Sequence, residues 1–148
     1  LFRSPAYIKD YFETYPKVKE YMDSLVEMGK SKGYVTSLYG RRRPIPELSA
    51  KNFMQRQFGE RIAMNSPIQG TAADIIKIAM NRVDARLRKE NMQSRLILQI
   101  HDELLVETKI EEIEEVSHIL NEEMIHAAAL KVPLIADVKQ GTTWYEAK

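Results

Sequence analysis

The 148-residue chain contains no cysteine, which excludes disulfide bonds and thiolate metal sites and fits a reducing compartment. No apolar run approaches the roughly 20 residues that a membrane-spanning helix needs, and no signal peptide is visible. The chain begins Leu1-Phe2-Arg3 without an initiator methionine, so we expect a segment of a longer protein. Hydrophobic residues make up 44% of the sequence, which is enough for a packed core.

The net charge of +1 conceals a strong asymmetry along the chain. Residues 1–95 carry 18 Lys and Arg against 10 Asp and Glu, whereas residues 96–148 carry 4 against 11. The basic excess is densest over residues 30–61, with eight basic and two acidic side chains. Such a region attracts phosphates, although charge alone favours the simpler interpretation of a solvated surface.

Apolar periodicity predicts long helices and a few short strands. Helical spacing covers residues 5–32, with a break at Pro16 and an end at Gly33. Further helices are expected over residues 51–65 and 110–129. Between them, Ser66-Pro67 is a start signal for a long helix to about residue 90, which is either kinked at Pro67 or begins near it. Strand-like composition covers residues 34–39, 95–100, 104–107 and 132–138. The prediction is an α+β fold, with helices packed on a small antiparallel sheet and an acidic motif on a β-hairpin.

That acidic motif, His101-Asp102-Glu103, stands where a hairpin normally turns on Gly or Asn. Carboxylates crowded at a rigid turn repel each other and favour a divalent cation, although one carboxylate at a turn is ordinary. Neighbouring residues on a strand point to opposite faces, so Asp102 and Glu103 should not both face one metal squarely. A two-metal site needs another carboxylate, and no pattern marks Asp74 or Asp137 as that partner.

A polar ladder is predicted from Arg61, Asn65 and Gln69, which lie four residues apart and align on one helical face. Such hydrogen-bonding side chains suit the groove edges, sugars and phosphates of a nucleic-acid duplex. The competing interpretation places Gln69 in a capping box begun by Ser66 and pairs Arg61 with Glu60 or another neighbour. Spacing alone favours this competing interpretation.

The sequence allows more than one role for two further groups of side chains. Arg41, Arg42 and Arg43 lie between a glycine and a proline, and they form either a rigid phosphate clamp or a solvated basic loop. His118 and His126 lie eight residues apart on an acidic helix, where surface or packing roles are simpler than metal ligation.

Three blocks of sequence, considered together, resemble the carboxy-terminal part of a family A DNA polymerase, the bacterial DNA polymerase I type. They read GYVTSLYGRRR at residues 33–43, ERIAMNSPIQGTAAD at 60–74 and LQIHDEL at 98–104. The ending at residues 132–145 is also similar, so the resemblance covers essentially the whole chain. Pro44 departs from it, because an aromatic residue is expected after the arginines.

The resemblance implies roles for individual residues. Asp102 would be a metal-binding catalytic carboxylate, Glu103 an adjacent acidic residue that supports the metal site, and His101 would lie near the primer terminus. Contacts with the primer–template DNA would come from Arg61, Asn65, Gln69, Arg41, Arg42 and Arg43.

The resemblance also implies a DNA-directed DNA polymerase of DNA replication and repair, a nucleotidyltransferase that uses two Mg²⁺ ions. Its partners would be primer–template DNA, deoxynucleoside triphosphates and the upstream remainder of the polymerase, in the bacterial cytoplasm and near the nucleoid. Residues 1–32 would belong to the fingers and residues 33–148 to the palm. Because the family's other essential carboxylate and its nucleotide-handling helix lie upstream, we expect the isolated chain to be inactive.

Two other functions remain open at this point. A nucleic-acid-binding module without catalysis would rest on the basic region of residues 30–61. An HD-type metal phosphohydrolase is suggested only by the His101-Asp102 pair, and it would need more His and Asp ligands than His118 and His126 provide.

Overall fold

The computed structural model describes residues 4–147, and side chains from residue 7 onward. The chain divides into two compact units, Leu1–Thr71 and Ala72–Lys148, which we call the first and second units. Each unit has a buried apolar cluster of its own. None of the helices in the described part of the chain combines the length and hydrophobicity that a membrane crossing requires.

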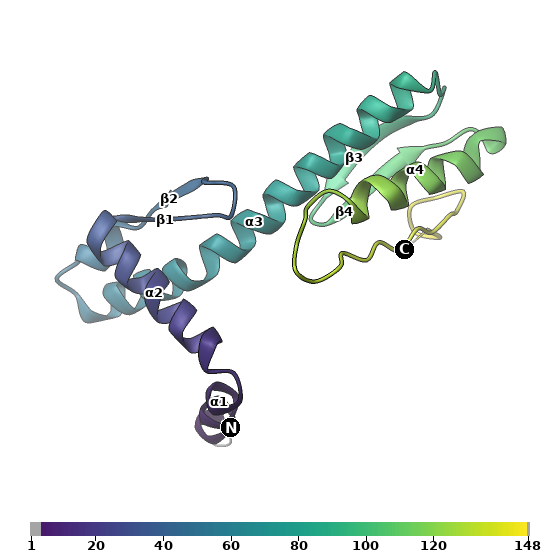
Figure 1. The fold of residues 1–148 in the computed structure, drawn as a ribbon. Helices are drawn as coiled ribbons and strands as arrows, with labels where there is room; N and C mark the ends of the chain where they lie inside the picture. The colour runs from purple at the N-terminus through teal and green to yellow at the C-terminus, as the bar shows by residue number, and fades with distance from the viewer. Residues whose placement is uncertain (1–3, 148) are drawn as a thin grey trace. The chain divides into compact units, whose positions relative to one another are not determined.

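The first unit is mainly helical and contains one short hairpin (Figure 1). Its elements are α1 (Ser4–Thr14), α2 (Pro16–Lys32), β1 (Tyr34–Thr36), β2 (Arg42–Pro44), the 3₁₀ helix η1 (Pro46–Ser49) and the start of α3 (Phe53–Lys89). The predicted break at Pro16 is confirmed. Gly33 ends α2 in the left-handed conformation with φ of 76°, as predicted for a helix-terminating glycine.

The core of the first unit forms where α2, the β1–β2 hairpin, η1 and α3 meet. Val35, Ile45, Leu48 and Ala63 are its buried members. Gly59 permits the close approach of α3 to η1, because a Cβ atom there would lie 2.9 Å from the backbone nitrogen of Leu48. This core holds together the strands and the helix that carry the basic side chains.

Of the two alternatives predicted at Pro67, the helix start is wrong, since α3 continues through Ser66 and Pro67. A proline inside a helix costs about 3 kcal/mol, because it lacks an N–H donor and crowds the preceding turn. Pro67 is itself buried, and Ala63 one turn earlier is fully buried, so packing offsets that cost. Thr71 Oγ1 also donates a hydrogen bond to the Pro67 carbonyl at 2.6 Å. Tertiary contacts therefore override the local start signal.

The second unit packs a β-hairpin against two helices (Figure 1). It contains the rest of α3, then β3 (Arg95–Ile100), β4 (Glu103–Glu107), the 3₁₀ helix η2 (Ile110–Glu112) and α4 (Ile113–Ile125). Val83 and Leu87 from α3 meet Val116 and Ile119 from α4 in a buried cluster. One side of the hairpin packs on that cluster through Leu96, Leu104 and Val106.

The strand predicted over residues 132–138 is wrong, because the structure has no strand in that segment. A strand needs a ladder of hydrogen bonds to a neighbour, and β3 and β4 pair only with each other. The segment is instead fixed to α4, where Asn121 Nδ2 donates a hydrogen bond to the Ala136 carbonyl at 2.9 Å. The predicted α+β fold is correct. In the described residues its strands form two separate two-stranded antiparallel sheets, β1–β2 and β3–β4.

Candidate functional site

The acidic motif lies at the turn of the β3–β4 hairpin. Ile100 pairs with Glu103, so His101 and Asp102 form a two-residue turn and Glu103 is the first residue of β4. His101 adopts the left-handed conformation with φ of 51°, which is uncommon outside glycine. The Gln99 side-chain amide donates to the His101 carbonyl at 2.8 Å and so fixes the turn.

Asp102 and Glu103 line the same pocket, which has a volume of about 390 Å³. Asp102 belongs to the turn rather than to a strand, so the alternation of faces expected for strand neighbours does not separate it from Glu103. Both side chains are exposed, and neither forms an ion pair with any described residue. Their charge is therefore available to a ligand.

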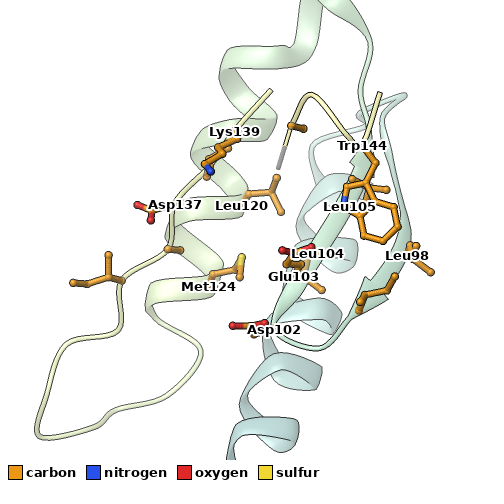
Figure 2. Close-up of a pocket in the computed structure, with 15 residues that line it drawn as sticks. Leu98, Asp102, Glu103, Leu104, Leu105, Leu120, Met124, Asp137, Lys139 and Trp144 are labelled. Carbon is orange, nitrogen blue, oxygen red and sulfur yellow. The ribbon is translucent and has the colours of Figure 1, made fainter. Parts of the chain in front are cut away.

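The other walls of the pocket come from α4 and the carboxy-terminal segment (Figure 2). Leu120 and Met124 are the α4 contributors, and Asp137, Lys139 and Trp144 come from the segment that follows. No sequence pattern indicated that Asp137 and Lys139 share a pocket with Asp102, because that depends on how the segment returns to the hairpin.

The carboxylates of the turn fit part of a magnesium site. Mg²⁺ takes oxygen ligands and usually binds through one or two carboxylates, with water and substrate phosphates completing its shell. Asp102 and Glu103 supply such donors. The described residues contain no group of three or more His, Cys, Asp or Glu side chains placed to hold a metal, so Asp137 does not complete a site. Further ligands would have to come from elsewhere.

Several other carboxylates of the second unit form ion pairs within the unit. The Arg86 guanidinium binds Glu90 at 2.7 Å and Glu123 at 3.1 Å, and it also binds Glu122, linking α3 to α4. Hydrogen bonding to Arg86 lowers the pKa of the Glu122 carboxyl, and burial opposes that shift. This network stabilises the scaffold of the pocket and leaves the hairpin turn free.

The ladder Arg61, Asn65 and Gln69 lies on α3 in the first unit, and all three side chains are exposed. Its competing interpretation is wrong on both counts. Glu60 pairs with Lys30 at 3.1 Å, and Arg61 has no ion pair among the described residues. Gln69 belongs to no capping box, because α3 passes through the proposed cap without a break.

The loop expected for the three consecutive arginines is only partly correct, since Arg42 and Arg43 lie on strand β2. Antiparallel pairing with β1 holds this strand in place, and all three arginines are exposed. The Arg42 guanidinium lies 4.9 Å from the centre of the Tyr34 ring, within the range of a cation–π contact. The Arg41 backbone N–H donates to Ser37 Oγ at 3.1 Å.

The histidines of the acidic helix both lie at the surface, one of the two roles expected for them. His118 Nε2 lies 3.4 Å from a Glu122 carboxylate oxygen, and His126 Nδ1 lies 2.8 Å from the Glu122 carbonyl. Neither histidine belongs to a metal-ligating group within the described residues. The phosphohydrolase alternative therefore gains no support.

The sequence has extensive matches among characterised proteins. The model of the family described as "DNA polymerase family A" matches residues 3–146. The chain is 52% identical over 142 residues to DNA polymerase I of Geobacillus stearothermophilus and 52% identical over 143 residues to that of Bacillus subtilis strain 168. These matches cover 96% and 97% of the chain but only 16% of each relative.

A solved structure has the same fold. It is the "POL domain of Pol1 from M. smegmatis complex with DNA primer-template and dNTP", with a TM-score of 0.91 and 41% sequence identity. The match covers 95% of this chain and 25% of that one.

Proposed function

The chain belongs to DNA polymerase family A, and from this premise we propose that it forms part of a DNA-directed DNA polymerase of bacterial replication and repair. The proposed substrates are primer–template DNA and deoxynucleoside triphosphates, which are the ligands of the M. smegmatis complex. Residues 1–32 would serve the fingers and residues 33–148 the palm, in an enzyme working at the bacterial nucleoid in the cytoplasm.

The observation that carries this proposal is the pair of carboxylates at the β3–β4 turn. Asp102 and Glu103 line one pocket and form no ion pair with the described residues, whereas nearby Glu122 is bound by Arg86. A carboxylate without an internal partner, held on a short hairpin, is suited to bind a cation that accompanies a phosphate substrate.

In the proposed reaction, the primer 3′ hydroxyl loses its proton and attacks the α-phosphate of the incoming nucleotide in line, and the bond between the α- and β-phosphates breaks to release pyrophosphate. Two bound Mg²⁺ ions would supply stabilisation of charge on the attacking and leaving oxygens. Asp102 would hold metal at the turn, Glu103 would support that site from the first position of β4, and His101 would lie near the primer terminus. The fixed turn limits the positions that these side chains can reach.

Basic and amide side chains of the first unit would bind the duplex. Arg61, Asn65 and Gln69 would contact groove edges and sugars, and the arginines of β2 would contact phosphates. Such contacts orient a duplex with little dependence on its sequence.

We also propose that the 148 residues are inactive alone, because the described residues do not complete a metal site. A nucleic-acid-binding module without catalysis is the second candidate, and the exposed arginines favour it. The two candidates differ in what they require of Asp102.

The deciding experiment is Asp102→Ala in the full-length polymerase that contains this segment. Loss of a metal-binding carboxylate is expected to lower primer extension by roughly 10³-fold or more, since metal ions contribute several kcal/mol to transition-state stabilisation. Primer–template affinity should be largely retained. Single-turnover extension and equilibrium DNA binding measure the two quantities separately.

The matched control is Asp137→Ala, which removes a carboxylate from the same pocket. We expect it to lower extension far less than Asp102→Ala. Unchanged extension by the Asp102 variant would support the non-catalytic module instead. Primer extension by the purified 148-residue chain with Mg²⁺ would contradict the proposed inactivity of the segment.

A further inference from the structure

Helix α3 carries two phenylalanine–arginine pairs with the same geometry. Phe53 precedes Arg56 by three residues, and Phe58 precedes Arg61 by three residues. In each pair the guanidinium carbon lies 5.9 Å from the ring centre, within reach of a cation–π attraction. Both rings are exposed, at 60% for Phe53 and 50% for Phe58. The main difference between the pairs is what else each arginine contacts.

In the first pair, Phe53–Arg56, the arginine also binds backbone carbonyls. Arg56 Nη1 donates to the Ala50 carbonyl at 3.0 Å and to the Lys51 carbonyl at 2.8 Å. Both carbonyls belong to the segment just before α3, so this arginine holds the entry to the helix. Its structural role is complete within the chain.

In the second pair, Phe58–Arg61, the arginine has no such backbone contact. Arg61 makes no side-chain hydrogen bond or ion pair with any described residue. Its acidic neighbour Glu60 forms an ion pair with Lys30 instead, at 3.1 Å. The Arg61 guanidinium lies over the Phe58 ring. The N–H donors of a guanidinium lie at its edges, so a contact with a ring leaves them available to a phosphate or a base edge.

We propose that Phe58 is a positioning residue for Arg61 in binding primer–template DNA. This inference rests on the proposed function. Residues three or four apart share a helical face, so Phe58 and Arg61 continue the face that carries Asn65 and Gln69. A free arginine loses much rotamer freedom when it binds. The Phe58 ring reduces that loss by holding the guanidinium beside the ladder before DNA arrives.

The test compares variants at Phe58 in the full-length polymerase that contains this segment. Phe58→Ala removes the ring, Phe58→Leu keeps an apolar side chain without a π face, and Phe58→Tyr restores an aromatic ring. The two non-aromatic variants should weaken primer–template binding about 2- to 5-fold, the range that a cation–π contact at an exposed site supplies. Phe58→Tyr should retain affinity close to wild type. The KM for primer–template should rise more than kcat falls.

A double-mutant cycle with Arg61→Ala identifies the route of the effect. Positioning predicts that Phe58→Leu has no further effect on affinity once Arg61 is removed. Additive losses would contradict the inference, as would wild-type affinity in Phe58→Leu. If the Arg61→Ala variant binds DNA with wild-type affinity, the proposed DNA contact of Arg61 is itself wrong. This result distinguishes a failure of that contact from a failure of the positioning role of Phe58 alone.

Phe53→Leu is the matched control, because Phe53 contacts its arginine at the same distance. Arg56 is already fixed by backbone carbonyls, so this variant should leave primer–template affinity unchanged. Equal losses of affinity in the Phe53 and Phe58 variants would mean that exposed rings on α3 act on DNA binding without a specific arginine, and would overturn the inference.

Discussion

The two units of the chain use their charges in different ways. Residues 1–71 contain twelve Lys and Arg against seven Asp and Glu, and residues 72–148 contain ten against fourteen. In the second unit, Arg86 binds three carboxylates, and Glu112 accepts hydrogen bonds from Gln93 and Ser94 just before β3. In the first unit, lysines form ion pairs with carboxylates, such as Lys30 with Glu60, and Arg61 and Arg42 contact aromatic rings instead.

The difference shows that net charge says less about a binding site than internal pairing does. The second unit is acidic, yet much of its charge stabilises the scaffold that supports the hairpin. In the first unit, the guanidinium groups of Arg61 and Arg42 are exposed beside aromatic rings, where a phosphate backbone could bind them. In the second unit, the corresponding exposed charges without an internal ion pair are the carboxylates of the β3–β4 turn.

The largest effect on stability is expected from the separate cores. Ile119→Ala in the second unit and Ile45→Ala in the first should each cost about 2–5 kcal/mol of unfolding free energy, because both side chains are almost fully buried. Trp144, the single tryptophan, reports on the second unit. Its fluorescence in urea should therefore respond more strongly to Ile119→Ala.

Circular dichroism on the same samples follows the helices of both units. Ile135→Ala is the control, since that side chain is 86% exposed and its removal should change stability by less than about 0.5 kcal/mol. Identical shifts of Trp144 fluorescence for the Ile45 and Ile119 variants would show that the two units unfold together.

A smaller effect is expected from Gly59→Ala, which tests the contact between α3 and η1. The new Cβ atom would lie 2.9 Å from the Leu48 backbone nitrogen, and backbone cannot move aside cheaply. The cost should be about 1–3 kcal/mol, measured by urea unfolding followed by circular dichroism. Gln57→Ala, at an exposed position of α3, should be almost neutral. Equal stability of the two variants would contradict the close packing described.

The charge contrast predicts that Arg43→Ala weakens DNA binding in the full-length polymerase by roughly tenfold or less. It should also lower the slope of log affinity against log salt by about one, because one phosphate contact is lost. Lys131→Ala removes an exposed cation from the second unit and should leave the slope unchanged. If both variants change the slope equally, the assignment of DNA contacts to the first unit is wrong.

The smallest expected effect concerns acid stability of the second unit. Hydrogen bonds from the Gln93 N–H, the Ser94 hydroxyl and the Ser94 N–H lower the pKa of the Glu112 carboxyl below its ordinary 4.5. A carboxyl with a lowered folded-state pKa stabilises the protein above the unfolded value, and that stability is lost as pH falls through the folded value. The urea midpoint should therefore fall with pH below about 4.5.

Glu112→Gln tests this origin of the acid sensitivity. The variant should be less stable than wild type at neutral pH, because the charged acceptor is lost, and its midpoint should fall less on acidification. Glu111→Gln changes an adjacent exposed carboxylate and serves as the control. An unaltered pH profile in Glu112→Gln would contradict the role assigned to these hydrogen bonds.

Local sequence signals predicted much of the fold. The break at Pro16, the end of α2 at Gly33 and the strands around His101 were correct because proline, glycine and short β-branched runs act through their own backbone preferences. The α+β fold was also predictable from the apolar periodicity, and the family from three sequence blocks. The roles of Asp102, Arg61 and the other proposed site residues remain predictions.

The errors lie where distant contacts outweigh local preference. Ser66-Pro67 has the pattern of a helix start, but burial of Pro67 allows α3 to continue. The segment of residues 132–138 has strand composition but does not pair with the β3–β4 hairpin.

The sequence by itself determined the elements with strong local signals, the acidic turn and the charge difference between the two parts of the chain. Only the tertiary structure decided that Asp137 and Trp144 share a pocket with Asp102, and that Arg56 is used internally while Arg61 is not. The physical reason is that backbone preferences act within a few residues, whereas burial and pairing depend on which distant groups fold against one another.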